Sequence, residues 1–261
     1  MLVLYHSGLT TCSRQVRHCL REKGLAYQSR YINLLRFEHL SPEYLKLNPN
    51  GVVPTLVHDG HAVINSACIN EYLDETFPQP PLSPADPRDR ARMRYWTWTA
   101  DDTHLQGARM TRNQRLKSSV EGMSADDTQL VLKTMPVPAR RERWQKQAAG
   151  GHSADEMETA LAHVRFIAGQ MEAELSARGP WLAGETFSLG DISMGSIVHR
   201  VNELYPELLP REVYPRVNDW FARLMARPAA VATYTPGTVE TPKIPPGRSV
   251  DGITDFRVAV D

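Results

Sequence analysis

Four residues with chemically useful side chains follow one another in the segment Leu-Tyr-His-Ser-Gly-Leu-Thr-Thr-Cys-Ser. They are Thr10, Thr11, Cys12 and Ser13. The segment joins a predicted strand to a predicted helix, and the free N–H groups and positive dipole end of a helix start favour an anion. A thiol held there loses its proton more easily. Lowering its pKa from about 8.5 to the mid-sixes needs roughly 3 kcal/mol, which one charge-assisted hydroxyl bond and the helix end can supply. The alternative is that Thr10, Thr11 and Ser13 only cap the helix.

A second segment could bind an extended peptide. Residues 48–56 read Asn-Pro-Asn-Gly-Val-Val-Pro-Thr-Leu. A proline at the start of a strand is tolerated at an edge or in a special turn, so the Val53-Pro54 bond is a candidate cis peptide bond. Such a bond would leave the main-chain N–H and C=O groups of Val53 facing outward, ready to pair with a peptide; the alternative is a simple edge-strand turn. Asn65 and Ser66 open a later predicted helix, whose start is a further anion-binding position unless Ser66 is a plain cap.

Strand and helix signals alternate over residues 1–78, and these elements must position both segments. Apolar runs predict strands, and apolar residues at helical spacing, bounded by turn or stop signals, predict helices. The predicted strands are residues 2–5, 26–34, 55–57 and 62–64, and the predicted helices are residues 12–23, 41–47 and 66–76. The order β-α-β-α-β-β-α is that of a thioredoxin-like domain.

The rest of the chain is helical in pattern. A proline-rich linker at 79–87 precedes an all-helical domain at 88–234, and a tail at 235–261 is predicted to be irregular. Capping signals and stop signals place helices at 87–110, 153–179, 188–204 and 213–227, the last stopped by Pro228. A polar insertion at 111–152 is predicted to hold two short helices, 125–134 and 139–148. The predicted fold class is therefore an α/β thioredoxin-like N-terminal domain followed by an all-α C-terminal helical bundle.

Composition argues against several kinds of function. The 261 residues include 30 basic and 30 acidic side chains and no basic block, which disfavours nucleic-acid binding and an anionic membrane partner. No apolar run reaches the roughly 18 residues of a spanning helix, and the first residues have a strand pattern rather than that of a signal peptide. The three cysteines form no CxxC pair, and the sequence has neither an HExxH metal motif nor a glycine-rich nucleotide loop. We therefore expect a cytoplasmic protein without a metal.

Taken together, these motifs closely resemble those of the glutathione transferase superfamily. The resemblance extends over about residues 1–110 and 153–235, and it includes the capping box Phe-Ser-Leu-Gly-Asp at 187–191. It implies glutathione as the co-substrate, an apolar or aromatic electrophile as the second substrate, and a homodimer as the active form.

The resemblance also assigns residues to a glutathione site. His39 matches a histidine that contacts the glycine carboxylate, Val53 should pair with the cysteinyl backbone, and Ser66 should hold the γ-glutamyl carboxylate. Asp101 or Asp102 matches an acid that in some classes reaches across the dimer to the γ-glutamyl ammonium. The glutathione-binding residues implied in this way are Thr11, His39, Val53, Pro54, Asn65, Ser66, Asp101 and Asp102.

The catalytic candidates are Thr10, Ser13 and Cys12. Thr10 falls where many classes place the catalytic serine, Ser13 lies one helical turn further on, and Cys12 falls where the beta-class enzymes place a cysteine. A β-branched threonine restricts how its hydroxyl can turn, so Ser13 and Thr10 rank nearly equal and Cys12 third. The sequence departs from the family pattern at two other positions: Asn65 stands where Glu or Gln is common, and Leu40 replaces a lysine that often follows the glycine-site histidine.

A looser resemblance points to one branch of the superfamily. Residues 135–144 look like a segment of the bacterial β-etherases, which cleave lignin-derived aryl ethers. The same branch is similar to this chain at Phe37, Glu38, Met93, Arg94 and Trp96 and in an acid near Asp101. Within the insertion, we expect Arg140, Arg141 and Arg143 to form a solvated helix face.

The sequence therefore predicts a glutathione transferase whose bound thiolate attacks an apolar or aromatic electrophile, in the etherase version displacing a phenolate. The second substrate is expected between the domains, beside the helix at 87–110 and the tail, in a pocket with Trp96, Trp98 and His104. For the tryptophans the alternative is a place in the core. Two other functions stay open: a non-catalytic glutathione-binding or ligand-binding module, and a glutathione-dependent reductase or peroxidase that uses Cys12.

Overall fold

Four strands form one mixed sheet in the N-terminal half of the protein. The computed structural model describes residues 1–8, 10–115, 123–149, 151–235, 237 and 249–258. The strands are β1 (Leu2–His6), β2 (Gln28–Tyr31), β3 (Thr55–His58) and β4 (His61–Ile64), in the spatial order β2-β1-β3-β4. β1 runs parallel to β2 and antiparallel to β3, and β4 is antiparallel to β3. All four predicted strands are confirmed, although β2 is shorter than the predicted 26–34.

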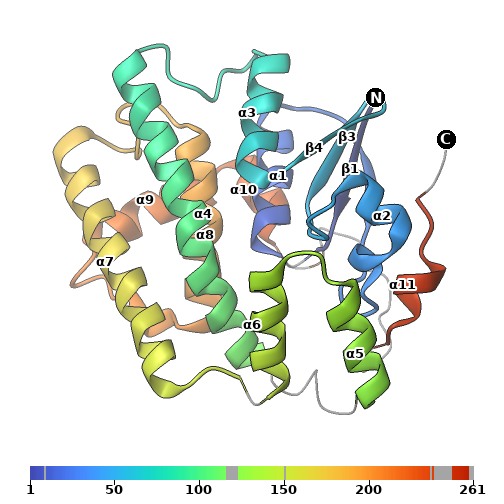
Figure 1. Cartoon of the computed structure of the whole chain (residues 1–261). Helices are drawn as coiled ribbons and strands as arrows, with labels where there is room; N and C mark the ends of the chain where they lie inside the picture. Colours follow the sequence, from blue (N-terminus) through green and yellow to red (C-terminus); the bar gives the residue numbers. More distant parts are fainter. Residues whose placement is uncertain (9, 116–122, 150, 236, 238–248, 259–261) are drawn as a thin grey trace.

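Helices cover both faces of this sheet (Figure 1). Successive side chains of a strand point to opposite faces. Leu2 and Leu4 of β1 accordingly pack in the core formed with α1 (Thr11–Glu22) and α3 (Ser66–Thr76). Tyr5 packs on the opposite face with Tyr44 of α2 (Pro42–Leu47). The predicted thioredoxin-like order of elements is confirmed, and α1 and α3 lie between the sheet and the helical half.

The C-terminal half is a helical bundle in which α8 is buried along nearly its whole length. Its helices are α4 (Pro87–Arg115), α7 (Ala154–Arg178), α8 (Leu189–Leu204), α9 (Pro215–Met225) and α10 (Pro228–Tyr234). The capping boxes predicted at the starts of α7 and α8 are confirmed. The helix predicted at 213–227 is α9 and ends before Pro228, but it is not the last helix: Pro228 is the first residue of α10, where its fixed φ and missing N–H are tolerated. Within the described ranges, no helix combines the length and apolar character needed to cross a bilayer.

The insertion and the tail fold back onto the N-terminal half. The helices of the insertion are α5 (Ala125–Thr134) and α6 (Pro138–Ala148), close to their predicted bounds. The tail is not irregular throughout, because α11 (Asp251–Asp255) packs on the short helix η1 (Glu38–Leu40). This described part of the tail therefore lies against the N-terminal half and not beside α4 as expected; residues 238–248 of that prediction lie outside the described residues. One buried cluster joins these elements: Phe37, Leu40, Val131, Leu132, Met135, Trp144 and Ile253.

Candidate functional site

The first turn of α1 brings a threonine and a serine hydroxyl together. Thr10 is the N-cap residue of α1, but its side chain accepts no hydrogen bond from the helix. The Thr10 hydroxyl donates to Oγ of Ser13 at 2.6 Å, with the carbonyl oxygen of Ser7 as a second acceptor at 3.2 Å. Ser13 Oγ also accepts from the N–H of Ser7 at 3.3 Å. The Thr10 side chain therefore does not occupy the N–H groups at the start of α1. These groups can bind an anion instead.

Ser13 itself is enclosed by the protein. Its side chain is 0% exposed, whereas Thr10 is half-buried. A hydroxyl without exposed surface cannot touch a ligand that arrives from solvent. The interpretation that ranks Ser13 with Thr10 as a residue touching the thiolate is therefore not supported. Ser13 instead holds Ser7 and Thr10 in place from behind.

Cys12, in the first turn of α1, lies against both α3 and α4. Its half-buried thiol makes hydrogen bonds with the side chains of Ser66 on α3 and His104 on α4. Burial by itself raises the pKa of this thiol, but the charge and hydrogen bond of His104 and the hydrogen bond of Ser66 outweigh it. The pKa of Cys12 therefore lies below its usual value, although the nearby Asp101 carboxylate acts in the opposite direction. His104, predicted in the substrate pocket, is thus a direct neighbour of the cysteine.

Asn65 ties the start of α3 to α4. Its Oδ1 accepts from the N–H groups of Ala67 at 2.9 Å and Cys68 at 3.2 Å, so it caps the helix. Its Nδ2 donates to Oδ2 of Asp101 at 2.9 Å. Asp101 thus meets the start of α3 of its own chain, and the buried Ser66 follows directly.

The segment before β3 has the edge that the sequence predicts. The Val53-Pro54 peptide bond is cis, as expected. The carbonyl oxygen of Val52 accepts from the Tyr44 hydroxyl at 2.6 Å and from Asn48 Nδ2 at 2.9 Å, which fixes the chain just before the edge. Among the described residues, no hydrogen bond involves the main chain of Val53. Its N–H and C=O groups are therefore available to an extended ligand.

His39 and Ser66 flank this edge. Gly51 has φ +56°, and a Cβ there would come within 3.0 Å of Leu40 and 3.2 Å of the His39 carbonyl oxygen, so this close contact requires glycine. His39 is buried and stacks on Phe37 with ring centroids 6.0 Å apart. His39 thus contacts the chain two residues before Val53, while Ser66 follows β4, the neighbour of β3.

A buried group of charges lies behind the first turn of α1. Arg14 donates to both carboxylate oxygens of Glu203 on α8, at 2.9 and 3.0 Å, and Arg200 contacts the same carboxylate at 3.0 Å. Arg200 Nε also donates to Thr11 Oγ1 at 3.5 Å. The Thr11 hydroxyl thus faces Arg200 of the helical half, and this contact argues against the assignment of Thr11 to glutathione binding. The sequence analysis missed this group; its only local signal is the i,i+3 spacing of Arg200 and Glu203 on a predicted helix.

Arg17 holds the same turn from the sheet side. Its Nη2 donates to the carbonyl oxygen of Gly8 at 2.7 Å, and its Nη1 donates to Nδ1 of His6 at 3.1 Å. Burial, with the charges of Arg17 and Arg21, lowers the pKa of His6 to about 3. His6 is therefore neutral at ordinary pH, which lets Nδ1 accept from Arg17 while Nε2 bonds Ser29 Oγ at 2.7 Å.

The two tryptophans predicted in the substrate pocket lie elsewhere. Trp96 is 2% exposed and belongs to the core of the helical half, and Trp98 is 66% exposed on the surface of α4. The side chain of Asp102 is also half exposed. Trp96 lies on a different face of α4 from Asp101, because consecutive helical residues are rotated by about 100°. Trp98, three residues before Asp101, lies beside it on the helix but is exposed to solvent. Asp101 and His104 of α4 contact the starts of α3 and α1, through Asn65 and Cys12 respectively.

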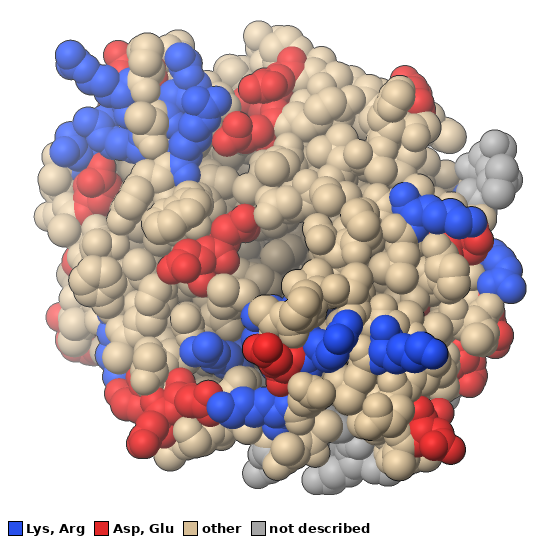
Figure 2. All heavy atoms as spheres, viewed as in Figure 1, with Lys and Arg blue, Asp and Glu red and all other residues tan. Residues whose placement is uncertain are grey.

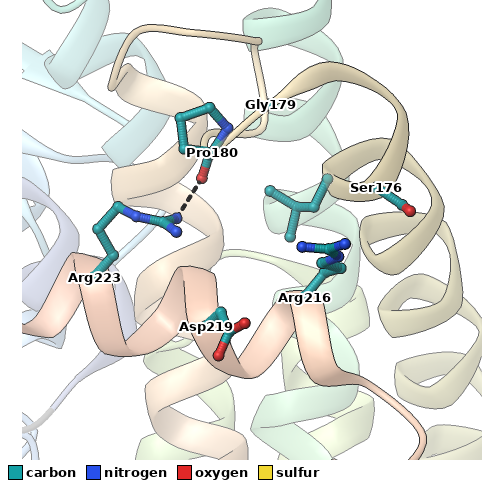
Figure 3. A pocket seen from close by; sticks show the side chains of 7 residues that line it. Ser176, Gly179, Pro180, Arg216, Asp219 and Arg223 are labelled. Atoms are coloured by element: carbon teal, nitrogen blue, oxygen red, sulfur yellow. Dashed lines mark hydrogen bonds between the residues drawn. The ribbon is translucent and has the colours of Figure 1, made fainter.

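The start of α1 opens on a hollowed face of the molecule. It lies near the centre of Figure 1, beside α4 and above α6, and Figure 2 shows a hollow in that region. A separate cavity of about 330 Å³ lies in the helical half, between the end of α7 and α9 (Figure 3). None of the predicted site residues lines that cavity, whose lining is Leu175, Ser176, Gly179, Pro180, Arg216, Asp219 and Arg223. In the described ranges, no group of three or more His, Cys, Asp or Glu side chains is placed to hold a metal ion.

Known proteins share this arrangement. The family described as glutathione S-transferase, N-terminal domain, matches residues 4–81, and the glutathione S-transferase C-terminal domain family matches residues 138–223. Protein LigF of Sphingobium sp. strain SYK-6 is 30% identical over 235 residues, which cover 87% of this chain and 91% of LigF. The crystal structure of the β-etherase LigF from that strain has a TM-score of 0.83 and 29% identity, and the match covers 89% of this chain and 98% of LigF.

A further relative matches over a shorter region. Maleylacetoacetate isomerase of Pseudomonas aeruginosa is 50% identical over 94 residues, 35% of this chain and 44% of the isomerase. The resemblance predicted from the motifs, including that to the β-etherase branch, is confirmed. The chain belongs to the glutathione S-transferase family.

Proposed function

We propose that this protein is a glutathione transferase that binds the tripeptide along Val53 and activates its thiol at the start of α1. The observation that carries the proposal is that the Thr10 hydroxyl follows the end of β1, at a helix start that it does not cap, and that the unpaired main chain of Val53 precedes β3, whose start pairs with the end of β1. The residues fit glutathione: the cysteinyl unit can pair with Val53, and the γ-glutamyl carboxylate can accept from Ser66 at the start of α3.

Thr10 is the proposed thiolate partner, with Ser13 behind it. A hydroxyl donates one hydrogen bond and accepts two. When glutathione binds, Thr10 would turn its proton from Ser13 Oγ, 2.6 Å away, toward the sulfur, and the Ser13 hydroxyl would donate to Thr10 in return. Arg14, Arg17 and Arg200 supply three buried positive charges behind this turn, against the carboxylate of Glu203. The excess positive charge favours the thiolate over the thiol.

The proposed reaction is nucleophilic substitution. The thiol proton passes to solvent, the thiolate forms a carbon–sulfur bond with the electrophile, and the bond to the leaving group breaks with its electron pair. The similarity to the β-etherase LigF supports an aryl ether as the substrate class. In that version the carbon–oxygen bond breaks and a phenolate leaves. Release of phenol from a β-aryl ether test compound checks this; conjugation of a generic aryl halide without any phenol release would reject the etherase version.

The ultraviolet absorbance of the thiolate tests the proposal directly. We expect glutathione bound to the wild type to titrate in the mid-sixes, about two units below a free thiol. Thr10→Ala should raise that pKa by about one unit, and Thr10→Ser should restore it. An unshifted pKa in the wild type would favour a non-catalytic glutathione-binding or ligand-binding module.

The contacts of Cys12 favour a second candidate function, glutathione-dependent thiol–disulfide exchange. The thiol bonds His104 and Ser66, and its pKa is lowered. The Cys12 thiolate would attack the glutathionyl sulfur of a mixed disulfide, form a disulfide with glutathione and release the other thiolate. A second glutathione would then attack this disulfide, release glutathione disulfide and restore Cys12. If Cys12→Ala alone abolishes turnover of aryl electrophiles, the assignment to Thr10 is wrong.

The proposed active form is a cytoplasmic homodimer that acts on small molecules, without a nucleic-acid or membrane partner. Residues 1–78 would bind glutathione, and residues 88–234 would supply the wall for the second substrate. Two large apolar side chains support the dimer: Trp98 is 66% exposed and Leu105 is 43% exposed. They are seven residues apart on α4 and therefore share one face.

A further inference from the structure

The α5–α6 insertion is built against the segments that flank the Val53 edge. Phe37 and Leu40, on either side of His39 in the sequence, share a buried cluster with Val131 of α5 and Trp144 of α6. Phe37 meets Trp144 edge-on, with ring centroids 6.1 Å apart, and stacks on His39 at 6.0 Å. One aromatic side chain thus connects α6 to His39.

The Arg140 side chain of α6 reaches the chain just before the Val53 edge. Nη1 of Arg140 donates to the carbonyl oxygens of Asn50 at 3.0 Å and Gly51 at 2.6 Å. Gly51 comes two residues before Val53, and a chain spans at most about 3.6 Å per residue, so the guanidinium lies within roughly 10 Å of Val53. Arg140, expected on a solvated helix face, is therefore part of the surroundings of the proposed peptide site.

A peptide bound in the proposed way has a fixed direction. With its γ-glutamyl end at Ser66 and its cysteinyl unit on Val53, its glycyl carboxylate points toward Gly51. The charges around the hollow are unevenly distributed: acidic side chains lie on its α4 side, and several Lys and Arg side chains, with an acidic one among them, lie below it over α6 (Figure 2). Leu40, next to His39, brings no charge to that end.

We propose that Arg140 recognises the free carboxylate at the glycyl end of glutathione, so that the insertion completes the binding site. This inference rests on the proposed function. A guanidinium suits the role because it pairs well with carboxylates and keeps its charge at all working pH values. By holding the carbonyl groups of Asn50 and Gly51, the same side chain also positions the chain before Val53.

Calorimetry with two ligands tests the proposal: glutathione, and glutathione with its glycyl carboxyl group esterified by ethanol. The wild type should bind glutathione about tenfold more tightly than the ester. Arg140→Gln should weaken the binding of glutathione until its affinity equals that of the ester, and should leave the affinity for the ester nearly unchanged. Arg140→Lys should keep part of the preference for glutathione over the ester. Arg143→Gln, on the same helix, is the matched control and should change neither affinity.

Two results would overturn the proposal. The first is equal affinity of the wild type for both ligands. This measurement does not depend on whether any variant folds. The second is equal weakening of both ligands by Arg140→Gln, which would mean that Arg140 only supports the loop. A wild type that binds neither ligand would reject the proposed function together with this inference, whereas glutathione binding without preference for the free carboxylate rejects this inference alone.

Discussion

Cys12 differs from the other two cysteines in its neighbours. His104 and Ser66 bond its thiol and lower its pKa, whereas burial, followed by the charge of Asp74, raises the pKa of the Cys19 thiol. Cys68 is exposed on α3. The thiolate is the reactive form of cysteine, so the His104 contact should be visible as selective reactivity.

We expect iodoacetamide to label Cys12 several-fold faster at pH 7 in the wild type than in His104→Gln, because the variant removes the charge and hydrogen bond that stabilise the thiolate. Mass spectrometry of peptides after timed labelling measures both rates. Cys68 in the same sample is the internal control, and its rate should not change. Equal Cys12 rates in the two proteins would contradict the contact.

His6 makes the stability of the fold depend on pH. Burial and the charges of Arg17 and Arg21 lower its pKa to about 3 in the folded protein, whereas an unfolded histidine titrates near 6.5. Above pH 6.5 neither state binds the proton. Between pH 6.5 and about 3 the histidine is protonated in the unfolded chain but not in the folded chain. The free energy of unfolding therefore falls as the pH falls through this window.

Because of this one histidine, the free energy of unfolding should be about 2 kcal/mol lower at pH 5 than at pH 7. Urea unfolding of the wild type and His6→Gln at both pH values measures it. The wild type should lose about 2 kcal/mol more than the variant on acidification. His61→Gln, at an exposed position of β4, is the control and should behave like the wild type. Equal losses in the wild type and His6→Gln would show that His6 titrates normally.

At the scale of the elements, charges join α1 to α8. Glu203 is the carboxylate shared by Arg14 and Arg200, whose side chains are 6% and 5% exposed. Removing one partner of a buried ion pair leaves the other charge without compensation in a poorly solvated place. The Glu203 carboxylate therefore stabilises the packing of α1 against α8.

Glu203→Gln should lower the free energy of unfolding by about 2–4 kcal/mol, somewhat less than for a fully buried pair because Glu203 is 23% exposed. Urea unfolding at pH 7 is the measurement. Glu207→Gln, on the exposed side of the short helix that follows α8, removes the same charge without a buried partner and should change little. A change for Glu203→Gln as small as for Glu207→Gln would mean that the group does not hold the two halves together.

At the scale of the whole molecule, we expect the exposed face of α4 with Trp98 and Leu105 to be buried against a second copy of the chain. We expect light scattering to give twice the chain mass, and Trp98→Glu to produce monomers at micromolar concentration, because a buried charge opposes association. Val231→Glu changes an exposed apolar residue on α10 and should leave the dimer intact. A wild type with the mass of one chain would contradict the proposal.

Much of the architecture follows from the sequence alone, because helix starts, turns and strand alternation depend on residues close together in the chain. The capping box at Ser153 lies within four consecutive residues, and the Asp59-Gly60 turn joins two short strands. The edge before Pro54 and the helix start at Thr10 are equally local. The cis bond before Pro54 and the start of α1 after Thr10 are both as the sequence predicts.

The residues that contact the site residues could not be predicted from positions close to them in the sequence. Thr11 and Arg200 are 189 positions apart, and Arg140 and Gly51 are 89 apart. Which residues of α1 are enclosed depends on how α8 and the other elements pack, and this decides that Ser13 and Thr11 are buried while Thr10 stays half-buried. Local sequence specifies which residues can form a helix or a cap, because those interactions span a few positions. Only the packing of whole elements decides which faces meet, since burial and charge pairing are summed over contacts between distant segments.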